Sequence, residues 1–254
     1  MKIQISELNI NYETSGSGED ILLLHGWGSS LDAFAGVRRL LENNYRVTAL
    51  DLPGFGKSDM PKEPWNVGNY CDLVLEFIEK LGLCNPILVG HSYGGRIILK
   101  LCGEKRVSPS KIILIAGAGV VTKKPLAVRV KQSFFKTVKC LAKCPLWSDA
   151  GEVFVDYFRR KLGSADYNSA PEVMRKTLVL SVNEDMTPIL PEIEAQALLI
   201  YGDKDTATPL AQARIIEKNV KNSHLCIVKD GGHWAFVEKA QEVLVPIAEF
   251  LNIQ

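Results

Sequence analysis

Apolar and polar residues follow two different periods along this chain. Short apolar or alternating runs predict eight strands, near residues 2–6, 9–14, 20–25, 45–50, 86–91, 111–116, 197–202 and 223–229. Stretches with helical apolar spacing predict helices near residues 31–42, 66–82, 93–105, 210–220 and 235–251. The first two runs and the Gly16-Ser17-Gly18 turn indicate an antiparallel start, whereas the later strands alternate with helices. The pattern therefore predicts an α/β fold with a mainly parallel sheet and helices on both faces.

The alternation is interrupted by one long insertion, between the strand that ends at Ala116 and the strand that starts at Ala197. We expect residues 118–186 to form a helical cap, or lid, inserted into a core domain made of residues 1–117 and 187–254. A chain of 254 residues is long enough to bury one α/β core and to carry such an insertion.

The most informative motif is Gly90-His91-Ser92-Tyr93-Gly94, which lies between a predicted strand and a predicted helix. The G-x-S-x-G pattern in this context is typical of a nucleophile elbow, a sharp turn that exposes a serine hydroxyl. The flanking glycines allow strand and helix to pack closely, where larger side chains would clash. The sequence therefore predicts that Ser92 is a catalytic nucleophile.

Four further segments accompany the elbow in a recognisable order: His25-Gly26-Trp27-Gly28, Asp51 to Ser58 (DLPGFGKS), Gly202 to Asp205 (GDKD), and Asp230 to His233 (DGGH). With them, most of the chain resembles the α/β-hydrolase-fold serine hydrolases, whose sheet has eight mainly parallel strands. The resemblance implies a Ser-His-Asp triad, with the three residues in the chain order Ser, acid, His. It also implies that no cofactor or metal is needed.

The base is chosen from four histidines, and the chain order implied by the resemblance excludes His25 and His91. His224 lies in a predicted strand, where a histidine is usually a packing or surface residue. His233 lies in a glycine-rich loop before the last helix, from which an imidazole can reach over the edge of the sheet. We therefore expect His233 to be the general base, and His25 to order its own loop by hydrogen bonding.

Two aspartates in the loop after the strand at 197–202 compete for the role of the acid. The family pattern G-x-x-D places the catalytic carboxylate at Asp205 and leaves Asp203 as a turn or capping residue. By the same resemblance, the backbone N–H groups of Trp27 and Tyr93 form the oxyanion hole. The Trp27 indole is expected to be buried or to line the acyl pocket.

Composition narrows the remaining possibilities. The formal net charge is +1, which gives no reason to expect nucleic-acid binding. The segment Gly54-Phe55-Gly56-Lys57-Ser58 ends like a phosphate-binding loop, but position 51 is aspartate where that motif needs glycine. The start of the chain lacks the apolar core of a signal peptide, and no run approaches the roughly 18 apolar residues of a transmembrane helix. We expect a cytoplasmic protein whose six cysteines are reduced thiols.

The predicted cap is basic, with twelve Lys or Arg against seven Asp or Glu over residues 118–186. Four of these cations share one predicted helical face: Arg129, Lys136, Lys139 and Lys143. A solvated helix face explains such a stripe. The alternative is a docking surface for an anionic partner, such as a carrier protein, or for an anionic membrane surface.

The sequence thus predicts a serine hydrolase that cleaves a small-molecule carboxylic ester through an acyl-enzyme. The HGWG segment, the triad spacing and the basic cap also resemble the pimeloyl carrier-protein methyl ester esterases. Ester cleavage is preferred over amide or carbon–carbon bond cleavage because it is the more frequent chemistry in the family, and a cofactor-free haloperoxidase activity is a further alternative. A receptor-like module that only binds a ligand on the same fold is the alternative from another class, and turnover would distinguish it.

Overall fold

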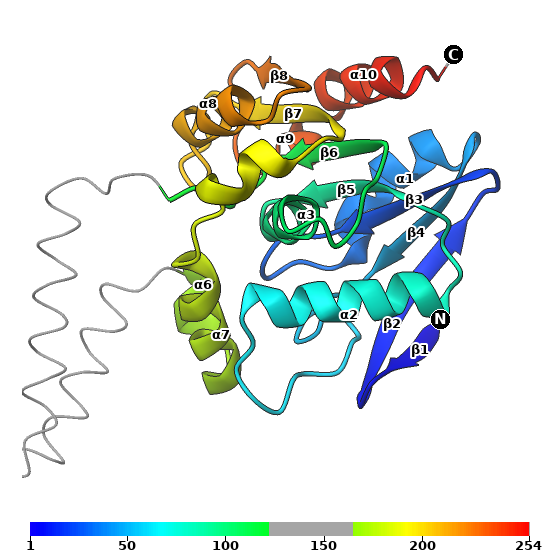
Figure 1. Cartoon of the computed structure of the whole chain (residues 1–254), viewed down its shortest axis with the longest axis vertical. Helices are drawn as coiled ribbons and strands as arrows, with labels where there is room; N and C mark the ends of the chain where they lie inside the picture. The colour runs from blue at the N-terminus through cyan, green and yellow to red at the C-terminus, as the bar shows by residue number, and fades with distance from the viewer. Residues whose placement is uncertain (122–164, 254) are drawn as a thin grey trace, which may run out of the picture.

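The computed structural model describes residues 1–121 and 165–253, and Figure 1 shows one central sheet with helices packed around it. The eight strands of this sheet are β1 (Lys2–Ile5), β2 (Leu8–Ser15), β3 (Glu19–Leu24), β4 (Tyr45–Leu50), β5 (Ile87–His91), β6 (Lys111–Ile115), β7 (Gln196–Gly202) and β8 (Ser223–Val228). Each agrees with a strand predicted from the apolar pattern, within one or two residues at either end.

The spatial order of the strands is β1-β2-β4-β3-β5-β6-β7-β8. The pairs β1–β2 and β2–β4 are antiparallel, whereas all pairs from β4 to β8 are parallel. The predicted α/β-hydrolase fold, with an antiparallel start and a mainly parallel sheet, is therefore confirmed. In the parallel part, the carboxyl ends of β3, β5, β6, β7 and β8 meet at one edge, which is where the connecting loops can bring side chains together.

Helices cover both faces of the sheet. They are α1 (Ala35–Leu41), α2 (Val67–Lys80), α3 (Tyr93–Gly103), α6 (Ala165–Ser169), α7 (Glu172–Val182), α8 (Leu210–Asn219), α9 (Ala235–Glu238) and α10 (Ala240–Leu251), with 3-10 turns η1 (Leu31–Phe34) and η3 (Thr187–Glu192). Helices α2, α3 and α8 pack on one face, and α1, α9 and α10 pack on the other. The two layers of helices leave the parallel strands buried on both sides.

Strand β3 shows how the sequence divides between the two faces. Its residues Leu22 and Leu24 belong to the core under α2 and α3, while Ile21 and Leu23 belong to the core under α1 and α10. All four are fully buried, as expected for a strand with helices on both sides.

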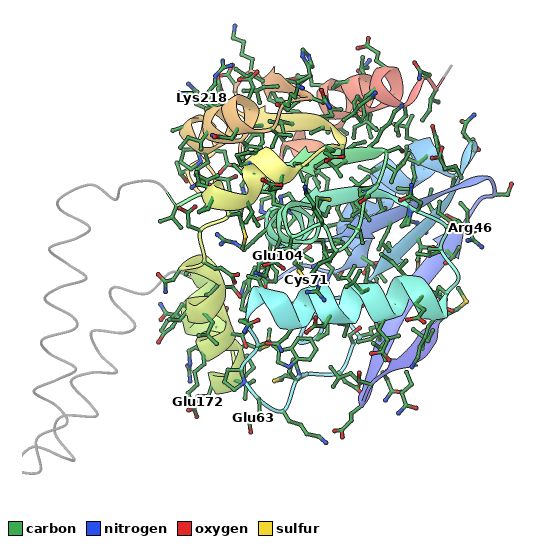
Figure 2. The ribbon with its side chains drawn as sticks, viewed as in Figure 1. Arg46, Glu63, Cys71, Glu104, Glu172 and Lys218 are labelled. Carbon is green, nitrogen blue, oxygen red and sulfur yellow. The ribbon has the colours of Figure 1, made fainter. Side chains whose placement is uncertain are left out.

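Figure 2 shows Cys71 of α2, a buried free thiol whose Sγ lies 3.7 Å from the Ile97 carbonyl of α3.

Two predicted helices are not continuous. The segment 31–42 begins as η1, capped by the Ser30 hydroxyl, and becomes α-helical only at Ala35. The segment 235–251 is divided into α9 and α10 at Lys239, whose φ of −129° and ψ of 47° are not helical. Apolar spacing runs through both junctions, which is why periodicity alone did not reveal them.

The predicted cap lies only partly within the described residues. Ala118 to Val121 leave β6 without regular structure, and α6 and α7 lead back to the core through η3. The stripe of Arg129, Lys136, Lys139 and Lys143 lies outside the described residues, as do Cys140 and Cys144. The division into a cap at 118–186 and a core therefore stays a prediction.

Candidate active site

Ser92 stands at the sharp turn between β5 and α3. Its φ of 48° and ψ of −106° are rare for a residue with a side chain, and such strain is stored at functional sites. The flanking glycines make the turn possible. A Cβ on Gly90 would lie 2.6 Å from the Gly95 amide nitrogen, and one on Gly94 would strike the Leu24 carbonyl of β3. The sequence motif thus produces the elbow geometry that was predicted from it.

Backbone hydrogen bonds hold this strained turn in place. The Ser92 N–H donates to the Ile115 carbonyl at the end of β6, over 3.1 Å. The Ser92 carbonyl accepts from the amides of Arg96 at 3.2 Å and Ala118 at 2.9 Å. Because these partners come from α3, β6 and the start of the predicted cap, the serine is fixed by three segments at once.

His233 reaches Ser92 from the loop between β8 and α9. Its Nε2 lies 3.0 Å from Ser92 Oγ, and its Nδ1 lies 2.8 Å from Asp205 Oδ2. The side chain of His233 is 21% exposed, whereas that of Asp205 is fully buried. The structure therefore brings together the three residues that the sequence predicted, although they are far apart in the chain.

Asp205 is held by its own loop after β7. Its Oδ1 accepts from the amides of Ala207 at 2.8 Å and Thr208 at 2.9 Å, and its Oδ2 accepts from the Thr208 hydroxyl at 2.7 Å as well as from His233. Burial on its own would raise the pKa of Asp205, but the hydrogen bonds from His233 and Thr208 outweigh it and hold the pKa below its usual value. The carboxylate stays ionised beside the imidazole.

The loops that carry the acid and the histidine are joined to each other. The amides of Asp203 and Lys204 donate to the carbonyls of Val228 and Gly231, at 3.1 Å and 2.9 Å. A side chain on Gly202 would strike the Gly231 carbonyl, so the glycine of the acid motif permits this close approach. Asp203 itself is exposed, as is His224 on β8, and neither contributes a side chain to the site.

The oxyanion-hole expectation rests on two backbone amides. Tyr93 is the first residue of α3, and amides in the first turn of a helix have no partner within the helix. Trp27 lies in the turn after β3, and its ring packs against Tyr93 with the centroids 5.4 Å apart. His25 anchors that turn, because its Nε2 accepts from the Leu52 amide at 2.9 Å and its Nδ1 bonds the Gly26 carbonyl at 2.7 Å.

Three residues near the site were not singled out by the sequence. Thr208 supports Asp205, as described above. His91, excluded as a base, is buried beneath the His233 loop, and its Nε2 lies 3.0 Å from the His233 carbonyl oxygen. Ser181 of α7 meets the Tyr93 hydroxyl at 2.9 Å. Sequence offered little signal for any of them, because each acts through a partner at least three residues and up to 142 residues away.

Helix α7 packs on the core near the elbow, beside the start of α2 (Figure 1). Besides the bond between Tyr93 and Ser181, the Trp65 amide donates to the Thr177 hydroxyl at 3.0 Å. Just beyond α7, the Arg96 guanidinium of α3 bonds the Glu184 carbonyl. These contacts connect the returning end of the predicted cap to the helix that begins at the nucleophile.

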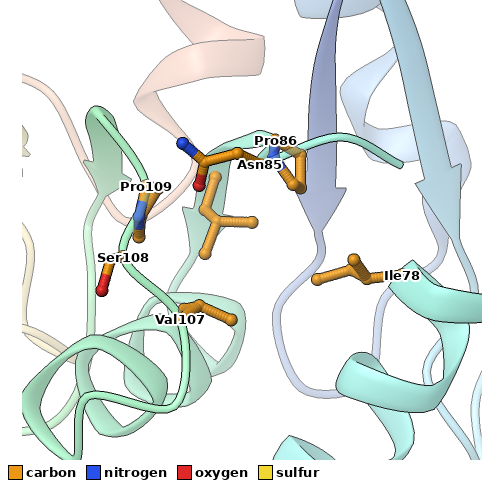
Figure 3. Close-up of a pocket in the computed structure, with 7 residues that line it drawn as sticks. Ile78, Asn85, Pro86, Val107, Ser108 and Pro109 are labelled. Atoms are coloured by element: carbon orange, nitrogen blue, oxygen red, sulfur yellow. The ribbon is translucent and has the colours of Figure 1, made fainter. Parts of the chain in front are cut away.

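Three further observations concern the rest of the described structure. A cavity of 130 Å³ lies at the amino ends of β5 and β6, between the end of α2 and Pro109, and is thus at the opposite end of the strands from Ser92 (Figure 3). Over the described residues, no group of three His, Cys, Asp or Glu side chains is arranged to hold a metal ion. Over the same residues, no helix is long and apolar enough to cross a bilayer.

Chemically, the arrangement supplies a hydroxyl, an imidazole that can take its proton, and a carboxylate that orients the imidazole.

The chain is similar to known proteins over most of its length. The model of the alpha/beta hydrolase family matches residues 21–246. The chain is 27% identical to a 2-hydroxy-6-oxo-6-phenylhexa-2,4-dienoate hydrolase of Comamonas testosteroni, over 98% of this chain and 93% of that protein.

Two further matches are esterases. The chain is 22% identical to a pimeloyl-[acyl-carrier protein] methyl ester esterase of Nitrosospira multiformis, with 97% of this chain and 99% of that protein covered. The solved structure of an esterase from Exiguobacterium antarcticum superposes with a TM-score of 0.77 and 25% identity, over 99% of this chain and 98% of that one. The similarity therefore extends over almost the whole chain.

Proposed function

The chain belongs to the alpha/beta hydrolase family, and from that premise we propose that it hydrolyses small-molecule carboxylic esters through a Ser92-His233-Asp205 triad. The observation that carries the proposal is the continuous chain of hydrogen bonds from Ser92 Oγ through both ring nitrogens of His233 to Asp205 Oδ2. The intermediate exposure of Ser92 and His233 lets a substrate reach the hydroxyl.

The proposed reaction follows from that chain of hydrogen bonds. His233 Nε2 accepts the Ser92 proton as Oγ attacks the ester carbonyl, and Asp205 stabilises the imidazolium. The ester C–O bond then breaks, and the imidazolium gives its proton to the leaving alcohol. Water attacks the acyl-enzyme with His233 again as base, which releases the acid and restores Ser92.

The developing negative charge on the carbonyl oxygen needs fixed donors. We assign these to the N–H groups of Trp27 and Tyr93, because one follows the nucleophile directly and the other lies in the turn after β3. The loss of one such donor typically costs about 100- to 1000-fold in rate. The His25 bonds to Leu52 and Gly26 support this role by fixing the backbone of the Trp27 turn.

A second candidate is hydrolysis of a carbon–carbon bond. It is favoured by the relative from Comamonas testosteroni, whose named substrate has a 6-oxo group, a ketone, in place of an ester. The same triad and oxyanion donors suit attack on either carbonyl. We place ester hydrolysis first because ester cleavage is the more frequent chemistry on this fold, and two of the matches described above are esterases.

The proposal is tested by labelling and turnover together. A fluorophosphonate should add once, at Ser92, and the wild-type protein should hydrolyse p-nitrophenyl esters with multiple turnovers. Ser92→Ala should lose both the label and the turnover, as measured by intact mass spectrometry and absorbance. Full labelling of the alanine variant would refute the assignment of the nucleophile. Labelling of wild type without turnover of any ester would favour a ligand-binding module, and turnover of a 6-oxo-dienoate alone would favour carbon–carbon cleavage.

We further propose that the enzyme acts in the cytoplasm and that residues 118–186 form its cap. The cations Arg129, Lys136, Lys139 and Lys143 are proposed to guide an anionic substrate or a carrier protein that bears one. The support is the charge of the cap sequence, together with the printed activity of the relative from Nitrosospira multiformis, an esterase of an acyl-carrier-protein ester.

A further inference from the structure

A second histidine, His91, is buried directly beneath the His233 loop and takes no part in the proton transfers proposed above. It is the last residue of β5 and is 1% exposed. Its Nε2 lies 3.0 Å from the backbone oxygen of His233. A carbonyl oxygen only accepts hydrogen bonds, so Nε2 must carry the hydrogen of the neutral ring.

The other ring nitrogen of His91, Nδ1, is buried and has no hydrogen-bond partner among the described residues. A Cβ on Gly26 would lie 2.6 Å from Nδ1, so the backbone of the turn after β3 packs directly against this side of the ring. An unpaired buried acceptor is unfavourable, so the favourable hydrogen bonding of the His91 ring comes from Nε2. His25, in contrast, has both ring nitrogens bonded.

The His91 ring fills the space between the nucleophile strand and the base loop. Its centroid lies 4.9 Å from that of His233, 4.7 Å from Trp234 and 4.6 Å from Phe236. Burial, together with the neighbouring His233, lowers the pKa of His91 to about 3. The ring is therefore neutral over the pH range in which a histidine base works, and its Nε2–H remains available as a donor.

We propose that His91 is a positioning residue, whose Nε2–H bond to the His233 carbonyl fixes the backbone of the base loop so that the imidazole stays aligned between Ser92 and Asp205. This inference rests on the proposed function, since it takes His233 as the base. The loop needs such a restraint because Gly231 and Gly232, which precede His233, are conformationally permissive. The hydrogen bonds of Nδ1 and Nε2 restrain the side chain of His233, and the hydrogen bond from His91 restrains its main chain.

Two substitutions separate this role from packing. In glutamine the amide nitrogen is as many bonds from Cα as His91 Nε2, whereas in asparagine it is only as far as Nδ1. His91→Gln should therefore keep the bond to the His233 carbonyl and stay within about threefold of wild-type kcat. His91→Asn should lose it and fall by about 100-fold in kcat, a loss of the size that a misplacement near 1 Å can cause. KM should change little in either. His91→Asn should also melt at the lower temperature, because the His233 carbonyl loses its donor, so both variants are assayed well below their melting temperatures.

The outcomes are distinct. Equal kcat for folded His91→Gln and His91→Asn, whether low or unchanged, would overturn the positioning role. If neither variant folds, nitrogen NMR of the wild-type protein decides: the neutral His91 ring should carry its proton on Nε2, and a proton on Nδ1 would overturn the proposal. Absence of ester turnover or of Ser92 labelling in the wild-type protein would instead count against the proposed function, because residue 91 is unchanged there.

Discussion

Two regions adjoin the candidate site: the carboxyl edge of the sheet, and the contact of α7 with the core through Thr177 and Ser181, which we call the seat of α7. Different interactions hold these two regions in place. At the sheet edge, Ser92, Asp205 and His233 follow β5, β7 and β8, and backbone hydrogen bonds tie their loops together. Strands β5 and β7 are placed by apolar burial on both faces, whereas β8 is only partly buried. The positions of the proposed catalytic groups are thus largely a consequence of how the core packs.

The seat of α7 is arranged the other way round. Its fully buried face includes the hydroxyls of Thr177 and Ser181, while Val179, Leu180 and Val182 are 45%, 48% and 48% exposed. Directional bonds to Trp65 and Tyr93 take the place of most apolar contacts. Packing of the core thus positions the proposed catalytic groups, whereas a few polar pairs position the adjoining helix α7.

The largest effect should come from the acid at the sheet edge. Asp205→Asn should lower kcat by about 10⁴, because an amide stabilises the wrong tautomer of the histidine base. Asp203→Asn, two residues away and exposed, is the matched control and should stay near wild type. Steady-state kinetics on a p-nitrophenyl ester measure both. The reverse ranking would move the acid to Asp203 and break the link between burial and catalysis.

Thr208→Val tests whether the loop, and not the histidine alone, holds the acid. Loss of the hydroxyl donor to Oδ2 should lower kcat by about tenfold, the equivalent of 1.4 kcal/mol. Thr206→Val, exposed in the same loop, is the control. Equal losses in the two variants would show that the loop tolerates no change, independently of the bond to Asp205.

The same variant should show a pH dependence of stability. The pKa of Asp205 is held down in the folded protein, partly by Thr208. A depressed carboxyl pKa stabilises the fold above the unfolded-state pKa of about 3.9, and that contribution is lost as pH falls through the folded-state value. Urea unfolding should therefore find Thr208→Val less stable than wild type above about pH 4, with the gap closing at lower pH.

At the seat of α7 the expected effects are smaller and coupled. Tyr93→Phe and Ser181→Ala should each cost about 1 kcal/mol of unfolding free energy, because each leaves a buried hydroxyl unpaired. The double variant should cost less than the sum of the two, which a double-mutant cycle measures. Strict additivity would mean that the pair does not bind α7 to the nucleophile helix.

The smallest effect should come from the predicted cap stripe. Reversal of Lys136 and Lys139 to glutamate should lower kcat/KM for an anionic ester several-fold and leave a neutral ester of similar size unchanged, since charges at a rim act mainly on encounter. Added salt should reduce the difference, because the Debye length is only about 8 Å at physiological ionic strength. An equal response of the two substrates would make the stripe an ordinary solvated face.

The sequence predicted the strands from local apolar patterns, and it predicted Ser92, Asp205 and His233 from motifs that resemble those of a known family. Apolar runs such as Ile21 to Leu24 identify buried strands, and a motif such as the one around Ser92 carries its own turn geometry. The partners of His91 and Tyr93 could not be predicted in this way. Their bonds join groups up to 142 residues apart in the chain, and no period along the sequence relates one member of such a pair to the other.

The edge position of β8 has a consequence for how the activity is lost. Among the described strands it pairs only with β7, and it is exposed at His224 and Ile227. Segments with few buried apolar contacts open at a lower free energy than the core, so we expect β8 to open before β3, β5 and β6. Because such opening displaces the His233 loop, activity should be lost at a lower denaturant concentration than the one that unfolds the core.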